Sequence, residues 1–464
     1  MTAGPLLERL ICAVPNTAQQ LAWIDDIVAF GVRRPGSATG AAVTRWCADQ
    51  LGSMGYAVEL QPVRCLTSHP GPARLDAWLV NDPSDRCSLD GFTAPFSTAV
   101  SARRFRLQPS DAPTTSGDAA LTHVPLVELP VALLDGARLG VFDPLDEFAT
   151  HTHVLPFGSR LGKEIDDVVA AGAGAMIGVF DAPWESAYYF VPYDGVLRPI
   201  PALWLDRSSG EVLDGLLARG AVDIEMTTEV VNEERVDHNV IATVAGGDAE
   251  RWIVVGSHHD APWASAVEDA SGVAQVLAQA AAWATIDPAD RLASMAFLLT
   301  AGHMSHGAGT RCFLESWQHR AHIQFGLHLE HIAAEAVPDG RGGLRPTDRP
   351  EVRWWFVSAD GELQRRLVDA VLEAVRAEDL DRSLALPPDL FGPFPPTDGG
   401  FYHLEGIPMV NLLAAPMYLF DPADRHEMVH AASLEPTARA AVRITLDAID
   451  GWGTGASGDH RGYE

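Results

Sequence analysis

Residues 251–260 read RWIVVGSHHD, residues 268–272 read EDASG, and residues 294–306 read SMAFLLTAGHMSH. The first and third runs contain apolar segments with the length of a buried strand, and histidines follow each of them. The second run places two acids where a helical pattern begins. Loops that follow neighbouring strands of an open α/β sheet meet at one edge, where such sheets bind ligands. The stretch therefore predicts a metal site assembled from separate loops.

The segments around this stretch repeat its alternation of strand and helix. An apolar run at 239–244 precedes it, and further strands are expected at 252–255, 295–299, 325–329, 352–357 and 409–413. Helices are expected at 272–284, 310–318, 362–376 and 436–449. Such alternation predicts a sheet flanked by helices. We expect an α/β fold with a mixed, mostly parallel sheet of about eight strands.

The rest of the chain divides around a second, smaller pattern. Residues 17–62 are expected to form helix, turn, helix and strand, and residues 138–230 short strands with crossing helices. We therefore expect one larger domain, formed by residues 1–69 and 233–452, interrupted by a β-rich insert at 70–232. The polar, glycine-rich end at 453–464 is expected to be a disordered tail.

Composition excludes several classes of function. Acidic residues outnumber basic ones by 62 to 33, for a formal charge of −29, and such a surface repels the phosphates of nucleic acids. A run of 18 apolar residues is missing, which argues against a membrane-spanning helix. The N-terminus lacks the pattern of a secretory signal, and the five cysteines are scattered. We expect a reduced, cytoplasmic protein; the sequence gives no indication of its oligomeric state.

The motifs, taken in order, resemble the co-catalytic zinc aminopeptidase family, whose relatives include glutaminyl cyclases and the transferrin-receptor ectodomain. Residues 254–260 resemble the family's strand ending in His-x-Asp, and residues 268–272 its Asp-Asn-Ala-Ser-Gly segment. Residues 397–408 resemble its Ser-Asp-His and Gly-Ile-Pro segments, and the loop at 34–37 also fits. Residues 138–225 look like the protease-associated insert of this family.

The resemblance implies a hydrolase in which two metal ions clamp a water molecule. By position, His258 is the first ligand, and Asp260 would orient it by accepting its second ring N–H. Glu268 falls at the family's bridging aspartate, and Glu330 at its next aspartate ligand. The cofactor implied is a divalent transition metal, zinc first, with iron or manganese as alternatives and one or two ions.

The chain departs from the family at its catalytic positions. Gly302 and His303 replace a Glu-Glu pair, so the general base is missing and an imidazole replaces a carboxylate ligand. Phe420, four residues before Asp424, replaces the family's late histidine. His303 and the two glutamates still offer ligand atoms with less negative charge, which favours one ion or a metal that prefers nitrogen ligands.

Residues 426–430 read HEMVH and match the HExxH motif. On a helix, His426 and His430 would lie on one face with Glu427 as the base, but a third acidic ligand on a downstream helix is missing. Three interpretations stay open. One of the two histidines replaces the lost late ligand, both are ordinary loop residues, or the motif is a true helical zinc site. We count His426 among the candidate ligands.

Each candidate also has a purely structural interpretation. Glu268 and Asp269 are acids at a helix start, where they cap the helix and favour its dipole. His258 is compatible with a satisfied strand-end histidine, and we expect His259, His306 and His331 to be bystanders.

The function expected from the sequence is metal-dependent hydrolysis of an amide-type bond in a small amine or peptide-like substrate. His258, Glu268, His303 and Glu330 would hold the metal, and Asp269 or a nearby histidine would supply the missing base. One alternative is a non-peptidase metalloenzyme, such as a lyase, deaminase or ring-opening hydrolase of specialised metabolism. The other is a catalytically inert binding or scaffold protein.

Overall fold

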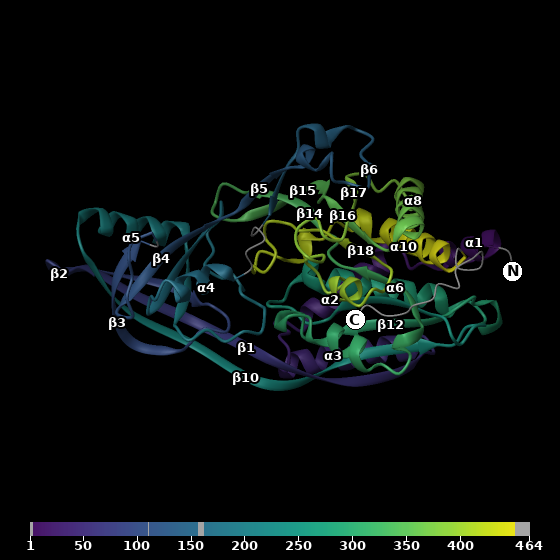
Figure 1. Cartoon of the computed structure of the whole chain (residues 1–464), viewed down its shortest axis with the longest axis horizontal. Coiled ribbons are helices and arrows are strands. Elements are labelled where there is room, and N and C mark those ends of the chain that lie inside the picture. The colour runs from purple at the N-terminus through teal and green to yellow at the C-terminus, as the bar shows by residue number, and fades with distance from the viewer. Residues whose placement is uncertain (1–2, 110, 156–161, 451–464) are drawn as a thin grey trace.

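The computed structural model of the protein describes residues 3–109, 111–155 and 162–450, so the tail predicted at 453–464 lies outside the described residues. The chain forms two lobes of unequal size (Figure 1). One continuous sheet runs through both, and in the larger lobe the predicted α/β architecture is confirmed: the sheet is mixed and its central strands are parallel. Within the described residues, none of the helices combines the length and apolar composition needed to cross a membrane.

The larger lobe contains eight strands of the sheet. In spatial order they are β10 (Val222–Val244), β12 (Ser294–Thr300), β11 (Trp252–His258), β13 (Ile323–Leu329), β18 (Met409–Leu413), β16 (Arg353–Ser358), β17 (Ser383–Leu386) and β6 (Gly140–Phe142). Its helices are α1 (Ala3–Ala13), α2 (Thr17–Ala29), α3 (Ala38–Ser53), α6 (Gly272–Ala284), α7 (Ala308–Ser316), α8 (Gly361–Ala377), α9 (Gly400–Leu404) and α10 (Ala431–Asp450). A hairpin of β14 (Ala334–Pro338) and β15 (Leu344–Pro350) lies beside the sheet.

The smaller lobe continues the same sheet. Its strands are β1 (Ala57–Leu79), β2 (Asp82–Thr93), β9 (Ala202–Asp206), β8 (Ala175–Asp181), β4 (Asp118–Pro125) and β3 (Val100–Pro109), with helices α4 (Lys163–Ala170) and α5 (Arg207–Arg219) beside them.

The core of the larger lobe lies on both faces of the sheet. Along β11, Ile253 and Val255 belong to the apolar cluster that includes α6, whereas Trp252 and Val254 belong to the cluster that includes α7. Because both faces are covered, β11 and β12 read as continuous apolar runs rather than alternating ones. This burial is why the sequence located these two strands well.

The carboxyl ends of the parallel strands meet at one edge of the sheet. His258, at the end of β11, lies opposite Thr300 at the end of β12, and Gly256 lies opposite His328 of β13. The loops that follow β11, β12 and β13 therefore leave the sheet side by side, which is the arrangement expected for a ligand site.

Two long strands, β1 and β10, join the lobes (Figure 1). They pair antiparallel from Ala57 with Thr243 to Leu79 with Val222. The expected domain boundaries at 69/70 and 232/233 fall inside this pair. The sequence predicted a strand only at the end of residues 17–62, whereas β1 continues to Leu79. Prolines and a glycine at 62–72, which usually interrupt strands, lie inside β1.

Residues 127–155 also cross between the lobes. Strand β6 pairs with β17 at the edge of the larger lobe, and β5 (Val127–Pro130) pairs with β7 (Thr152–Leu155) in a separate sheet. Val131 and Phe148 pack in the same core as Trp354. The segment expected as a single insert is thus divided between both lobes.

Candidate metal centre

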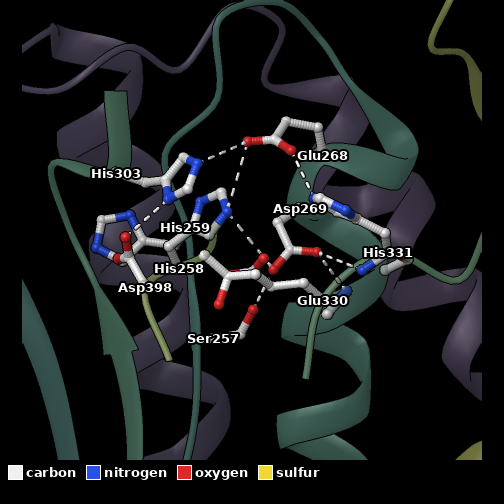
Figure 2. A network of polar contacts seen from close by, with 12 residues as sticks. Ser257, His258, His259, Glu268, Asp269, His303, Glu330, His331 and Asp398 are labelled. Carbon is white, nitrogen blue, oxygen red and sulfur yellow. Dashed lines mark hydrogen bonds and ion pairs between the residues drawn. The ribbon is translucent and has the colours of Figure 1, made fainter. Parts of the chain in front are cut away.

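Five buried side chains converge where the parallel strands end (Figure 2). His258 is the last residue of β11, Glu268 lies in the turn before α6, and His303 lies in the 3₁₀ turn after β12. Glu330 and His331 directly follow β13. All five are at most 5% exposed. The structure therefore brings together four of the ligands predicted from the sequence and adds His331, which the sequence treated as a bystander.

The turn that carries Glu268 is held from two sides. Asp424 accepts hydrogen bonds from three successive backbone N–H groups, those of Ala266 at 3.1 Å, Val267 at 2.8 Å and Glu268 at 2.8 Å. The buried Arg33 guanidinium donates to the carbonyl of Glu268 at 2.9 Å. These bonds fix the backbone of Glu268 before any ligand binds.

His258 is oriented by the backbone of Asp260. Its Nδ1 lies 2.9 Å from the Asp260 carbonyl oxygen, and since a carbonyl only accepts, Nδ1 carries the hydrogen and Nε2 offers a lone pair. Nε2 faces Glu268 Oε1 at 3.5 Å. The Asp260 carboxylate instead accepts from the backbone N–H groups of His303 at 3.1 Å and Met304 at 3.0 Å. Asp260 therefore positions two candidate ligands at once.

His303 lies against His258 and is oriented by Asp398. The two imidazole rings are parallel, with centroids 3.9 Å apart. Asp398 Oδ1 lies 2.9 Å from His303 Nδ1, and the other Asp398 oxygen accepts from the Thr310 hydroxyl at 2.9 Å. Nε2 is thereby directed at Glu268 Oε1, 3.6 Å away. Burial alone would lower the pKa of His303, but the neighbouring carboxylates, Asp398 first, raise it well above the usual value.

His331 approaches Glu268 from the opposite side. Its Nδ1 lies 2.6 Å from the carbonyl oxygen of Ala414, and its Nε2 lies 2.6 Å from Glu268 Oε2. Burial lowers the pKa of His331, and the Glu268 carboxylate outweighs it, raising the pKa to about 10. The only sequence signal for this residue was its place directly after Glu330 at a strand end.

Glu330 and Asp269 complete the surroundings of the cluster. Glu330 Oε1 contacts His328 Nε2 at 2.7 Å. Asp269 Oδ1 accepts from the backbone N–H groups of Gly272 at 3.0 Å and His331 at 3.2 Å, and Oδ2 accepts from the Ser257 hydroxyl. Both Asp269 oxygens thus tie β11 and the start of α6 together, as a helix cap does.

His426 does not join the cluster. It lies in a 3₁₀ turn (His426–Met428) rather than on an α-helix, and its side chain is 45% exposed with Nδ1 2.6 Å from Asp25. His430 Nδ1 contacts the Ser433 hydroxyl at 2.6 Å. The placement of His426 among the ligands is therefore corrected: the HExxH spacing requires a helix that begins only at Ala431.

The position expected for a late histidine is filled by aromatic rings. Phe420 is 2% exposed, and its ring lies 4.8 Å from that of Tyr193. Tyr193 belongs to the segment between β8 and β9, and its ring stacks on His303 with a centroid distance of 5.4 Å. Burial first, and then the nearby carboxylates, raise the pKa of Tyr193, so its phenol stays protonated. The smaller lobe thus contributes a residue to the wall of the site.

The donor atoms of the cluster fit a metal ion. Glu268 Oε1 and Nε2 of His258 are buried without a hydrogen bond to the described residues, and Nε2 of His331 faces Glu268 Oε2. Such orphaned atoms are rare in folded proteins. The contacts of 3.5 and 3.6 Å around Glu268 Oε1 approach the ligand–ligand separation of about 3.4 Å that tetrahedral zinc with bonds of about 2.0–2.1 Å requires.

Another group of potential ligands lies outside this centre. His151, His153 and Glu351 bring ligand atoms close together. However, His153 Nδ1 lies 3.2 Å from Glu351, and the Arg382 guanidinium lies 2.9 Å from His151 Nε2. A permanent positive charge at that distance opposes a cation, so this group is better explained as a buried ion-pair network.

Comparisons with known proteins support the fold. The search against family models finds no match. A segment of 63 residues is 36% identical to leucine aminopeptidase 2 of Trichophyton equinum and, equally, of Trichophyton tonsurans. It covers 14% of this chain and 13% of those relatives. The match thus spans little more than an eighth of the curated relatives.

Solved structures match over nearly the whole chain. A peptidase M28 precursor from Shewanella amazonensis aligns with a TM-score of 0.70 and 16% identity, covering 96% of both chains. An aminopeptidase from Aneurinibacillus sp. strain AM-1 aligns at 0.63 with 17% identity, covering 95% of this chain and 96% of the other. The zinc aminopeptidase BSAP from Bacillus subtilis aligns at 0.63 with 14% identity, covering 94% and 96%. The chain therefore has the aminopeptidase-like α/β fold, and both of its lobes have counterparts in these proteins.

Proposed function

We propose that this protein is a metal-dependent hydrolase that cleaves an amide-type bond in a small amine or peptide-like substrate. The observation that carries the proposal is the position of Glu268. Its carboxylate is fully buried, and its two oxygens face the imidazole nitrogens of His258, His303 and His331. It lies at the edge of an aminopeptidase-like sheet where ligands bind. The fold shared with zinc aminopeptidases supports zinc as the metal, with iron or manganese as alternatives.

Some residues of the chain would bind the metal ion, and others would orient the side chains that bind it. His258, Glu268, His303, Glu330 and His331 offer the ligand atoms. A bound divalent ion would supply Lewis-acid polarisation of the substrate carbonyl and an acidified water. Asp260 and Asp398 orient the imidazoles through their second ring nitrogens, as residues around metal ligands commonly do.

The general base of this hydrolase would come from a side chain at a position other than 302. Gly302 has no side chain at the position where the resemblance implies a glutamate. Asp269 has both oxygens engaged, which favours a nearby histidine for this role. If Asp269 is nevertheless the base, Asp269→Asn should retain the metal and lose turnover. Unchanged turnover in that variant would exclude it.

The test is a hydrolysis assay on metal-free and zinc-loaded protein. Chromogenic aminoacyl anilides, dipeptides and N-acyl amines would be offered in parallel, with His258→Ala as the inactive control and His426→Ala as the matched active one. We expect turnover of at least one amide that requires metal and is lost only in His258→Ala. A metal-loaded protein that cleaves none of these amides would contradict the proposal.

A second candidate function is favoured by Gly302 and Phe420. Both replace functional side chains of the family that the sequence resembles, whereas His303 keeps the ability to bind metal. This combination suits a non-peptidase metalloenzyme, such as a lyase, deaminase or ring-opening hydrolase. Metal binding without amide hydrolysis would favour it, and failure to bind any divalent metal would favour an inert binding or scaffold protein.

A further inference from the structure

Two sets of possible metal ligands share one residue. His258, Glu268 and His303 form one set, and His258, Glu330 and His331 form the other. The Nδ1 atom of His258 is bound to the Asp260 carbonyl, so only Nε2 offers a lone pair. One lone pair binds one ion. His258 can therefore bind only one ion, and a second ion would have to be held without it.

The geometry around Glu268 agrees with a single centre. Its Oε1 lies within 3.6 Å of Nε2 of both His258 and His303, and its Oε2 lies 2.6 Å from Nε2 of His331. The carboxylate thus lies among three imidazole nitrogens (Figure 2).

A second ion beside His303 would lack ligands. On that side the described residues provide two ligands, His303 and one oxygen of Glu268. The ring of Tyr193 stacks on His303, and the ring of Phe420 packs against Tyr193. Two protein ligands are fewer than the three that catalytic zinc sites use.

We propose that the cluster binds a single divalent transition-metal ion, with Nε2 of His258 as the central ligand and His303, His331 and Glu268 around it. Glu330, held by His328, closes the remaining side. This inference rests on the metal centre of the proposed function but not on hydrolysis. Because three of the ligands are imidazoles, the site should prefer zinc, cobalt or nickel to magnesium, calcium or manganese.

The stoichiometry of metal binding tests the inference without any substrate. Chelator-treated full-length protein would be titrated with zinc against a chromogenic competitor, and the bound metal counted by elemental analysis. We expect one tight equivalent in the native protein and none in His258→Ala. His303→Ala and His331→Ala should each bind at least about 10-fold more weakly, while His426→Ala should bind like the native protein. Thermal unfolding of each metal-free variant would confirm that it is folded.

Cobalt provides an independent readout. One equivalent of Co²⁺ should produce the full visible absorption of the site, and a second equivalent should add nothing. Two tight equivalents of zinc, or unchanged affinity in His331→Ala, would overturn the inference. One bound ion without amide hydrolysis would refute the proposed function alone, and two bound ions with hydrolysis would refute this inference alone.

Discussion

Replacing Asp424 by alanine should loosen the turn that presents Glu268. The Asp424 carboxylate accepts three backbone N–H groups, at residues 266, 267 and 268, over distances of 2.8–3.1 Å. All three residues are fully buried. A buried donor left without an acceptor costs about 1–3 kcal/mol. Water entering the space left by the carboxylate would satisfy part of the loss, so we expect the low end of the sum, about 3 kcal/mol.

Hydrogen exchange measures this loss at the amides concerned. With about 1.4 kcal/mol for each factor of ten, the amides of residues 266–268 should exchange about 100-fold faster in metal-free Asp424→Ala than in the native protein. Asp424→Asn keeps one carbonyl oxygen and should show an intermediate effect.

Asp421→Ala is the matched control for Asp424→Ala. Asp421 is buried three residues away, but it accepts from the backbone N–H of Ala423 instead of from the turn. Its removal should leave exchange at residues 266–268 unchanged. Native exchange rates at these amides in Asp424→Ala would show that the Asp424 carboxylate does not hold the turn.

Four further predictions concern single side chains. Burial raises the pKa of Asp421 to about 6, so the folded state holds this proton more tightly than the unfolded state, and stability falls as pH rises from about 4 to 6. Asp421→Asn should therefore gain up to about 3 kcal/mol on the native protein over that window, measured by urea unfolding; a constant difference would contradict this. Asp398→Ala should weaken zinc binding by about 10–100-fold, because His303 loses its orienting partner; competition titration measures the affinity, and an unchanged value would argue against the role. Tyr193→Ala should weaken binding by about 2–10-fold through loss of ring stacking on His303, whereas Tyr193→Phe should match the native protein in the same titration. His426→Ala should leave affinity unchanged, because this exposed side chain pairs with Asp25; a loss of bound zinc would restore it as a ligand.

The strands that the sequence predicted well are those in which apolar residues form one continuous run. Strands β11 and β12 are buried on both faces, so their apolar runs appear directly in the sequence. The ribbon of β1 and β10 gave a weaker signal, because several of its buried positions hold polar residues, among them Gln61, Thr67 and Thr228, and because prolines interrupt β1. Long-range pairing, rather than local preference, extends these strands.

The site shows the same division between local and long-range information. His258 and Glu268 lie in short motifs whose spacing is local, and their convergence followed from the sheet topology. The role of Asp398 depends on contacts across the fold, with His303 some 95 residues away. The sequence favoured His331 as a bystander, and in a continuing strand a residue next to a ligand would point away from it. Here the backbone at His331 is left-handed, with φ of 61°, and the ring faces Glu268 at 2.6 Å.

His426 illustrates the limit of a motif without its context. The HExxH spacing puts two histidines on one face only if the segment is helical. Arg425 and Val429 have extended backbones on either side of a single 3₁₀ turn. The residues of the HExxH motif are therefore present, but they lack the helical backbone that would place the two histidines on one face.

Diffraction data collected at the zinc absorption edge, from crystals of the zinc-loaded protein, would test the metal centre most directly. We expect one strong anomalous peak per chain, within bonding distance of His258 Nε2 and a Glu268 oxygen. A peak only at His151, His153 and Glu351, two peaks at the cluster, or no peak in fully loaded protein would contradict it.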